Sequence, residues 1–78
     1  MPTGIILAYS IPEGAQVLID GSIAATRYGF ARTPAIIDQV AAGTRNVTFK
    51  LPGYADVIMS TEVPQGGYTT VTAILHPV

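Results

Sequence analysis

Residues 45–51 have the sequence Arg45-Asn46-Val47-Thr48-Phe49-Lys50-Leu51, in which polar and apolar side chains alternate. Successive side chains of a β-strand point to opposite faces of a sheet, so a period of two predicts a strand with one buried face. Val47, Phe49 and Leu51 are then expected to face the core. The stretch indicates a sheet that is covered on one side.

Segments rich in Val, Ile, Thr and Tyr recur along the chain, separated by glycine- and proline-containing turns at intervals of about 8 to 12 residues. No segment has the period of 3.6 that is typical of a helix. We expect strands over residues 4–10, 15–20, 35–39, 45–51, 55–63 and 68–76. The sequence therefore predicts an all-β protein, a small antiparallel β-sandwich of six or seven strands that forms one domain over residues 1–78.

Alternation in these segments places one set of side chains inward: Ala15, Val17, Ile19, Val57, Met59, Thr61, Val71, Ala73 and Leu75. It leaves apolar residues on the nominally outer faces, namely Leu18, Ile58, Ile74 and either Ile5 or Ile6. If they gather on one sheet, they form an apolar outer face that favours another sheet or another copy. The alternative is that they are scattered or covered by a loop.

The composition is unusually apolar for a short chain. Hydrophobic residues make up 49% of the 78 residues and charged residues 12%, and the charged share is about half that of a typical soluble domain. A domain of this size buries a smaller fraction of its surface than a large one does. We therefore expect a neighbouring protein to cover part of the apolar surface.

Several partner classes are excluded by charge and hydropathy. A net charge of −1 does not supply the phosphate contacts that nucleic-acid binding requires. The longest apolar runs are only a few residues, against roughly 20 for a membrane span. Met1-Pro2-Thr3-Gly4 has neither the basic nor the apolar region of a signal peptide. We expect no nucleic-acid partner, no membrane span and no signal peptide in this chain.

No constellation of catalytic or metal-binding residues is apparent, so we expect no enzyme activity, no metal and no cofactor. His76 is the only histidine and lies two residues from the end of the chain, where it is poorly placed to act as a held base. The acidic residues are spread singly and do not form a calcium loop. The chain has no cysteine, which excludes disulfides and zinc sites of the usual cysteine type.

The segment Ile11 to Gly21 contains Pro12-Glu13-Gly14-Ala15 and resembles the signature of the PEGA domain. The other family motifs follow in order across nearly the whole chain: Thr33-Pro34, Val40 to Gly43, Val47 to Phe49 and Pro52-Gly53-Tyr54. The resemblance implies a small β-sandwich related to immunoglobulin-like or transthyretin-like modules. It also implies a non-catalytic part of surface, envelope or S-layer proteins.

The chain departs from the family pattern between Gly21 and Thr33, where eleven residues, 22–32, replace about five. This insertion contains Arg27, Tyr28, Phe30 and Arg32. Arginine with aromatic residues is typical of interface anchors, and loops on a rigid scaffold often carry recognition. We interpret the insertion as a protein contact loop. The alternative is an extended hairpin whose aromatic side chains fold back onto one end of the sandwich.

These features predict a structural module for assembly or adhesion, whose partner is protein: copies of itself or a host assembly. The setting is a cell surface or, alternatively, a virion in which the chain decorates the capsid or belongs to the tail. A further alternative is a polysaccharide-binding adhesion module in which tyrosine rings stack on sugars. The candidate rings are Tyr9, Tyr28, Tyr54 and Tyr68.

Overall fold

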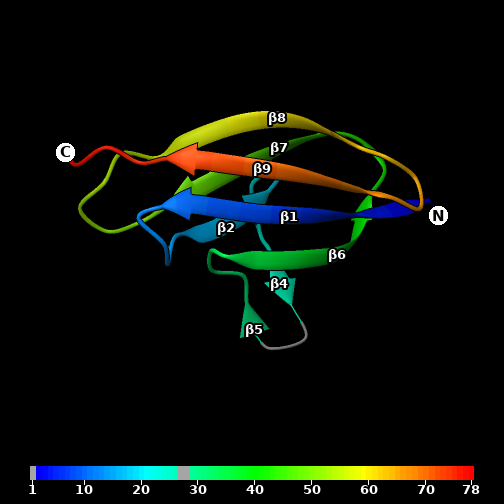
Figure 1. The fold of residues 1–78 in the computed structure, drawn as a ribbon, viewed down its shortest axis with the longest axis horizontal. Helices are drawn as coiled ribbons and strands as arrows, with labels where there is room; N and C mark the ends of the chain where they lie inside the picture. The colour runs from blue at the N-terminus through cyan, green and yellow to red at the C-terminus, as the bar shows by residue number, and fades with distance from the viewer. Residues whose placement is uncertain (1, 27–28) are drawn as a thin grey trace.

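The structure, a computed structural model, describes residues 2–26 and 29–78 and consists of two packed β-sheets (Figure 1). The three-stranded sheet has the order β6-β1-β9, from β6 (Ala35–Ala41), β1 (Thr3–Ile11) and β9 (Tyr68–Ile74). The four-stranded sheet has the order β3-β2-β7-β8, from β3 (Ser22–Ile23), β2 (Gln16–Ile19), β7 (Gly43–Lys50) and β8 (Val57–Val63). The predicted all-β sandwich of six or seven strands is confirmed, and the predicted segments coincide with six of these strands to within a few residues.

Strand pairing is antiparallel in both sheets with one exception, since β1 and β9 run parallel, with Ile5 opposite Tyr68 and Ile11 opposite Ile74. The chain reaches β9 from β8, in the other sheet, and then runs beside its own first strand (Figure 1). The first and last strands of the chain are therefore neighbours. Parallel neighbours need such a crossover connection.

A β-bulge interrupts β6 and decides which of its side chains are buried. Gly4 pairs with Val40 and Ile6 with Ile37, so Asp38 and Gln39 together oppose Ile5, and Gln39 has a φ of 57°. The extra residue shifts the alternation of the strand by one position. As a result Ile37 and Val40, which are three residues apart, are both buried in the core.

The core is built from small side chains around a few large ones. The largest fully buried side chains are those of Phe49, Ile6, Val17, Val47 and Val63. Val47 and Phe49 belong to β7, which confirms that the apolar side of the alternating stretch faces the core. Among the residues whose burial the structure describes, six of the fifteen buried hydrophobic ones are alanines. All nine isoleucines lie among the described residues, and six of them are exposed. Most of the isoleucines thus lie outside, while alanines fill much of the interior.

Both arms of the insertion 22–32 are hydrogen-bonded to β2. The amide of Ala24 donates to the carbonyl of Val17 (3.0 Å), and the amide of Val17 donates to the carbonyl of Ala31 (3.2 Å). Between these two anchors the chain forms a separate two-stranded ribbon of β4 (Ala25–Thr26) and β5 (Gly29–Phe30), which projects beyond β6 in Figure 1. The insertion therefore extends the edge of the four-stranded sheet and adds a protruding hairpin.

Candidate interaction surfaces

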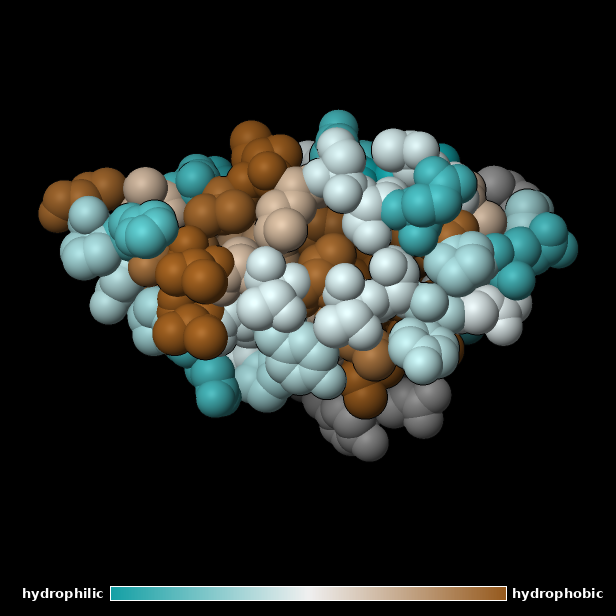
Figure 2. All heavy atoms as spheres, turned by 45° about the horizontal axis from the view of Figure 1, so that its top comes forward, coloured by the Kyte–Doolittle hydropathy of each residue, from teal (hydrophilic) through white to brown (hydrophobic). Residues whose placement is uncertain are grey.

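The outer surface of the three-stranded sheet carries a continuous set of apolar side chains, which we call the apolar face. Its exposed members are Ile5, Tyr9, Ile11, Ile36, Tyr68 and Ile74, with Leu7 half-buried among them. The register makes them neighbours, because Leu7 pairs with Ile36 on one side and Thr70 on the other. In Figure 2 hydrophobic residues gather toward the end where β1 and β9 terminate, and paler residues cover the middle.

The apolar face is large for a domain of this size. Ile36 and Tyr68 are 66% and 67% exposed. If a fully exposed side chain of this size presents about 200 Å², the six exposed members together present roughly 700 Å². Monomeric proteins rarely expose contiguous apolar patches of more than a few hundred Å². Within β6, β1 and β9, all of which are described, Asp38 is the one charged residue. The face is therefore both apolar and nearly uncharged.

The predicted outer-face residues Leu18, Ile58 and Ile74 do not form one patch. Leu18 and Ile58 lie on the four-stranded sheet, where each pairs with Thr48 from opposite sides. Ile74 lies on the other sheet because β9 pairs with β1, and it belongs to the apolar face. Of the pair left open by the sequence, Ile6 is buried and Ile5 is exposed.

The predicted contact loop is only partly within the described residues. Arg27 and Tyr28 lie outside them, and Phe30 is placed by its backbone, which pairs with Ala25 in the β4–β5 ribbon. Arg32 is exposed at the base of the ribbon, where its Nη1 donates to the carbonyl of Gly14 (3.5 Å). It lines a shallow hollow that also includes Lys50 and Asp56, an ion pair at 3.5 Å.

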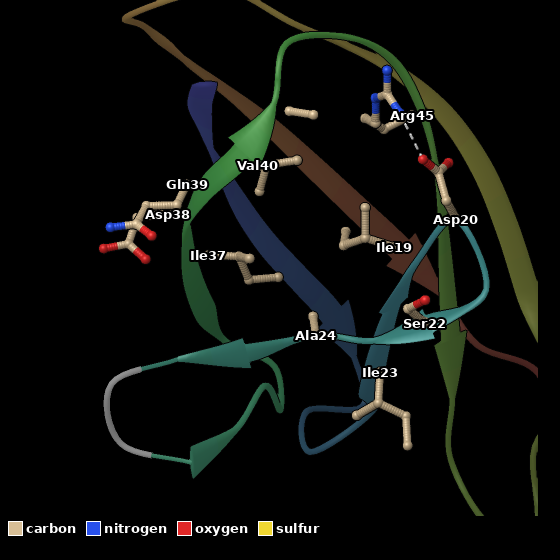
Figure 3. A pocket seen from close by; sticks show the side chains of 11 residues that line it. Ile19, Asp20, Ser22, Ile23, Ala24, Ile37, Asp38, Gln39, Val40 and Arg45 are labelled. Atoms are coloured by element: carbon tan, nitrogen blue, oxygen red, sulfur yellow. Dashed lines mark hydrogen bonds and ion pairs between the residues drawn. The ribbon is translucent and has the colours of Figure 1, made fainter. Parts of the chain in front are cut away.

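A second hollow of about 270 Å³ lies between the β2–β3 turn and β6 (Figure 3). Ile19, Ala24, Ile37 and Val40 form its apolar walls, whereas the side chain of Asp38 points away from it. These walls offer an incoming ligand contact surface but little acid, base or nucleophilic chemistry.

An ion pair closes one end of this hollow. Arg45 Nη1 donates to Asp20 Oδ2 (2.8 Å), and Asp20 Oδ1 accepts the amide of Asn46 (2.9 Å). This backbone hydrogen bond first, and then the Arg45 side chain, lowers the pKa of Asp20 below its ordinary value. Arg45 Nη2 also donates to the carbonyl of Ala42 (3.4 Å). The Asp20 carboxylate and both Nη atoms of Arg45 are therefore hydrogen-bonded to each other or to the backbone, whereas Arg45 Nε is buried without a hydrogen-bond partner.

The described part of the chain contains no group of three or more His, Cys, Asp or Glu side chains placed to hold a metal ion. His76 is exposed, and its carbonyl accepts the amide of Ala55 (2.9 Å). None of the described residues belongs to a helix long and apolar enough to cross a membrane.

Fold and surface together define a small β-sandwich module with one apolar, nearly uncharged outer face. The family model of the PEGA domain matches residues 3–78, so the chain belongs to the PEGA domain family. No curated protein matches it. PEGA domains are in general small non-enzymatic modules, typically of extracellular or surface proteins.

Proposed function

We propose that this protein is a non-catalytic structural module that mediates protein–protein contacts, chiefly with further copies of itself, in a surface layer, a filament or a virion. The observation that carries the proposal is the distribution of isoleucine and alanine. Six of nine isoleucines are exposed, while six of the fifteen core positions in the described part of the chain are alanine. Covering exposed apolar area stabilises an assembly by about 25 cal/mol per Å² removed from water.

The apolar face is the contact surface in this proposal. Its exposed apolar area of roughly 700 Å² is close to the roughly 800 Å² that each partner contributes to an interface of standard size. A second copy is a suitable occupant because it offers an equally apolar and uncharged surface, so that no charge is buried without a partner. Asp38 lies on the strand at the border of this face, where water still reaches the rim of an interface.

The proposal is tested by sedimentation velocity over a concentration series. Wild-type protein is expected to grow from small to larger species as concentration rises. Ile36→Lys, which places a charge on the apolar face, is expected to reduce the average size at each concentration. Ile23→Lys introduces the same charge on the four-stranded sheet and serves as the control, since Ile23 is also exposed. A strictly monomeric wild-type protein would overturn the proposal, and so would a loss of association in Ile23→Lys alone.

Polysaccharide binding is a second candidate, favoured by the exposure of Tyr9 and Tyr68 on the same face. Tyrosine rings with one open side can stack on the apolar faces of sugars. Tyr54 is less suited because its ring packs partly against the core. A glycan array probed with wild-type protein and Tyr68→Ala distinguishes the candidates, because binding by a monomer that is lost in the variant favours the adhesion role.

A further inference from the structure

The edge of β9 that faces away from β1 is open. The carbonyl of Gly67 accepts the amide of Ile5 (2.9 Å), and the amide of Leu75 donates to the carbonyl of Ile11 (2.8 Å). Backbone groups of successive residues in a strand point to opposite edges. The odd-numbered residues of β9 therefore face β1, and the even-numbered ones, from Tyr68 to Ile74, direct their N–H and C=O groups to the other edge. Over Tyr68–Ile74 no other strand of the described residues pairs with that edge, and directly beyond it the carbonyl of His76 accepts the amide of Ala55 (2.9 Å).

β9 also lacks the features that protect the other three edges of the two packed sheets. β3 has only two residues, and β6 carries a bulge and is contacted by β4. β8 carries Glu62. β9 has seven residues, Tyr68–Ile74, without a charge, a proline or a bulge. Exposed edges of this kind readily pair with another strand.

The space beside β9 is incompletely covered. β8 lies next to β9 at the margin of the molecule (Figure 1), and Oγ1 of Thr61 and Oγ1 of Thr69 are hydrogen-bonded at 3.2 Å. Val57, Met59 and Thr61 of β8 have the inward-facing register, yet all three are only half-buried. The three-stranded sheet ends at β9, so a further strand beside it would cover them.

We propose that β9 pairs edge to edge and antiparallel with β9 of a second copy, which merges two three-stranded sheets into one six-stranded sheet. This inference rests on the proposed self-association and specifies its pairing. Centred on Val71, the pairing places Tyr68 opposite Ile74 of the second copy and Thr70 opposite Thr72 of the second copy. Aromatic–β-branched and Thr–Thr pairs are favourable across strands. In this register all four residues with open backbone groups exchange hydrogen bonds, and no charged side chains meet.

Edge pairing and the apolar face reinforce each other. Two seven-residue strands alone bury less than the roughly 1,000 Å² of a stable interface, so the edge by itself gives a weak dimer. Merging the sheets joins two apolar faces into a continuous one of about twice the area. The edge-paired dimer is then the unit that packs further through this face.

The edge is tested in the Ile36→Lys background, in which contact through the apolar face is weakened. Thr72→Pro removes an N–H that points to the open edge and leaves the pairing with β1 intact. Thr72→Val keeps this N–H and is the matched control. Sedimentation should show concentration-dependent dimers for Ile36→Lys and for Ile36→Lys/Thr72→Val. Ile36→Lys/Thr72→Pro should dimerise at least tenfold more weakly.

The outcomes separate the two proposals. If Ile36→Lys alone is monomeric while wild type assembles, edge pairing is wrong and the role of the face stands. If Ile36→Lys assembles like wild type and Thr72→Pro is monomeric, the edge stands and the face does not carry assembly. Equal dimerisation of the Pro and Val variants overturns edge pairing.

If Thr72→Pro fails to fold, a cross-linking experiment tests the pairing of β9 with β9 of a second copy. The chain has no cysteine, so Thr70→Cys and Thr72→Cys each provide a single thiol. Hydrogen-bonded antiparallel partners have Cα atoms about 5.5 Å apart, which a disulfide can bridge. Mild oxidation of an equimolar mixture should yield mainly the mixed disulfide dimer. Equal yields of mixed and like-with-like dimers, or no dimer, would contradict the proposed register.

Discussion

Thr33 Oγ1 accepts the backbone amide of Ala15 at 3.0 Å, across 18 positions of sequence. It also accepts the amide of Gly14 (3.1 Å) and is hydrogen-bonded to Ser10 Oγ, whose own proton goes to the carbonyl of Pro12 (2.8 Å). Thr33 and Ser10 are both buried. Two family motifs, Pro12 to Ala15 and Thr33-Pro34, are thus joined by these hydrogen bonds. They anchor the C-terminal end of the insertion to the turn after β1.

Thr33→Val should destabilise the fold without a large change of shape. The variant leaves the buried amide of Ala15 without its acceptor and removes the hydrogen bond between Thr33 and the Ser10 hydroxyl, and an unsatisfied buried group costs about 1–3 kcal/mol. We expect the free energy of unfolding to fall by about 2–3 kcal/mol, measured by urea denaturation. Thr33→Ser keeps the hydroxyl and should lose less than half as much. Equal stability of the Val and Ser variants would show that the hydroxyl is not what holds the turn.

Gly4→Ala should destabilise the protein through a steric clash. A Cβ at this position would clash with the carbonyl oxygen of Pro64 and would lie 2.7 Å from Cγ1 of Val63. Because one of these atoms belongs to the backbone, the turn between β8 and β9 has to move, at a cost of about 1–3 kcal/mol. Thermal unfolding should show a clearly lower Tm than wild type. Thr3→Ala, at the exposed neighbouring position, should unfold close to wild type, and a similar Tm for Gly4→Ala would contradict the tight packing.

Most of the fold follows from local patterns in the sequence. The alternation in residues 45–51 correctly predicts that Val47 and Phe49 are buried. Asp20-Gly21, a pair typical of tight hairpin turns, forms the turn between β2 and β3 with positive φ at both residues. The bulge at Gln39 and the parallel pairing of β1 with β9 were not predicted. Both depend on partners far away in sequence, which local periodicity does not specify.

The apolar face was only partly predictable, and the reason lies in β1. Its outward side chains include Ile5, Leu7, Tyr9 and Ile11, all of them large, while Ala8 and Ser10 point into the core together with one large side chain, Ile6. Alternation identifies two faces of a strand, but hydrophobicity then favours the wrong one as the inner face. The signal that would have helped is size: a thin sandwich needs small side chains between its sheets.

The stability contributed by Asp20 should disappear in acid. Its pKa is lowered in the folded state by the Asn46 amide and by Arg45. The ionised Asp20 side chain therefore stabilises the fold in full at pH values above the ordinary aspartate pKa. This stabilisation is lost as the pH falls through the lowered pKa of the folded state. Asp20→Asn should therefore be less stable than wild type at pH 7 and equal to it at strongly acidic pH, in urea titrations at low salt. Asparagine tolerates the positive φ of this turn position, so a deficit that persists in acid would point to the backbone and not to the charge.

The aromatic residues of the insertion, Tyr28 and Phe30, should contribute to association and not to folding, as the arginine and aromatic content of the insertion predicts. Replacing both Tyr28 and Phe30 by Ser should weaken self-association in sedimentation experiments while Tm changes by no more than a few degrees. Phe49→Ala provides the reference for a true core position: Phe49 is fully buried, and truncation there should cost about 3–5 kcal/mol. If the double variant instead loses stability on the scale of Phe49→Ala, the two aromatic side chains belong to the core, and the contact surface has to be sought in the apolar face and the β9 edge alone.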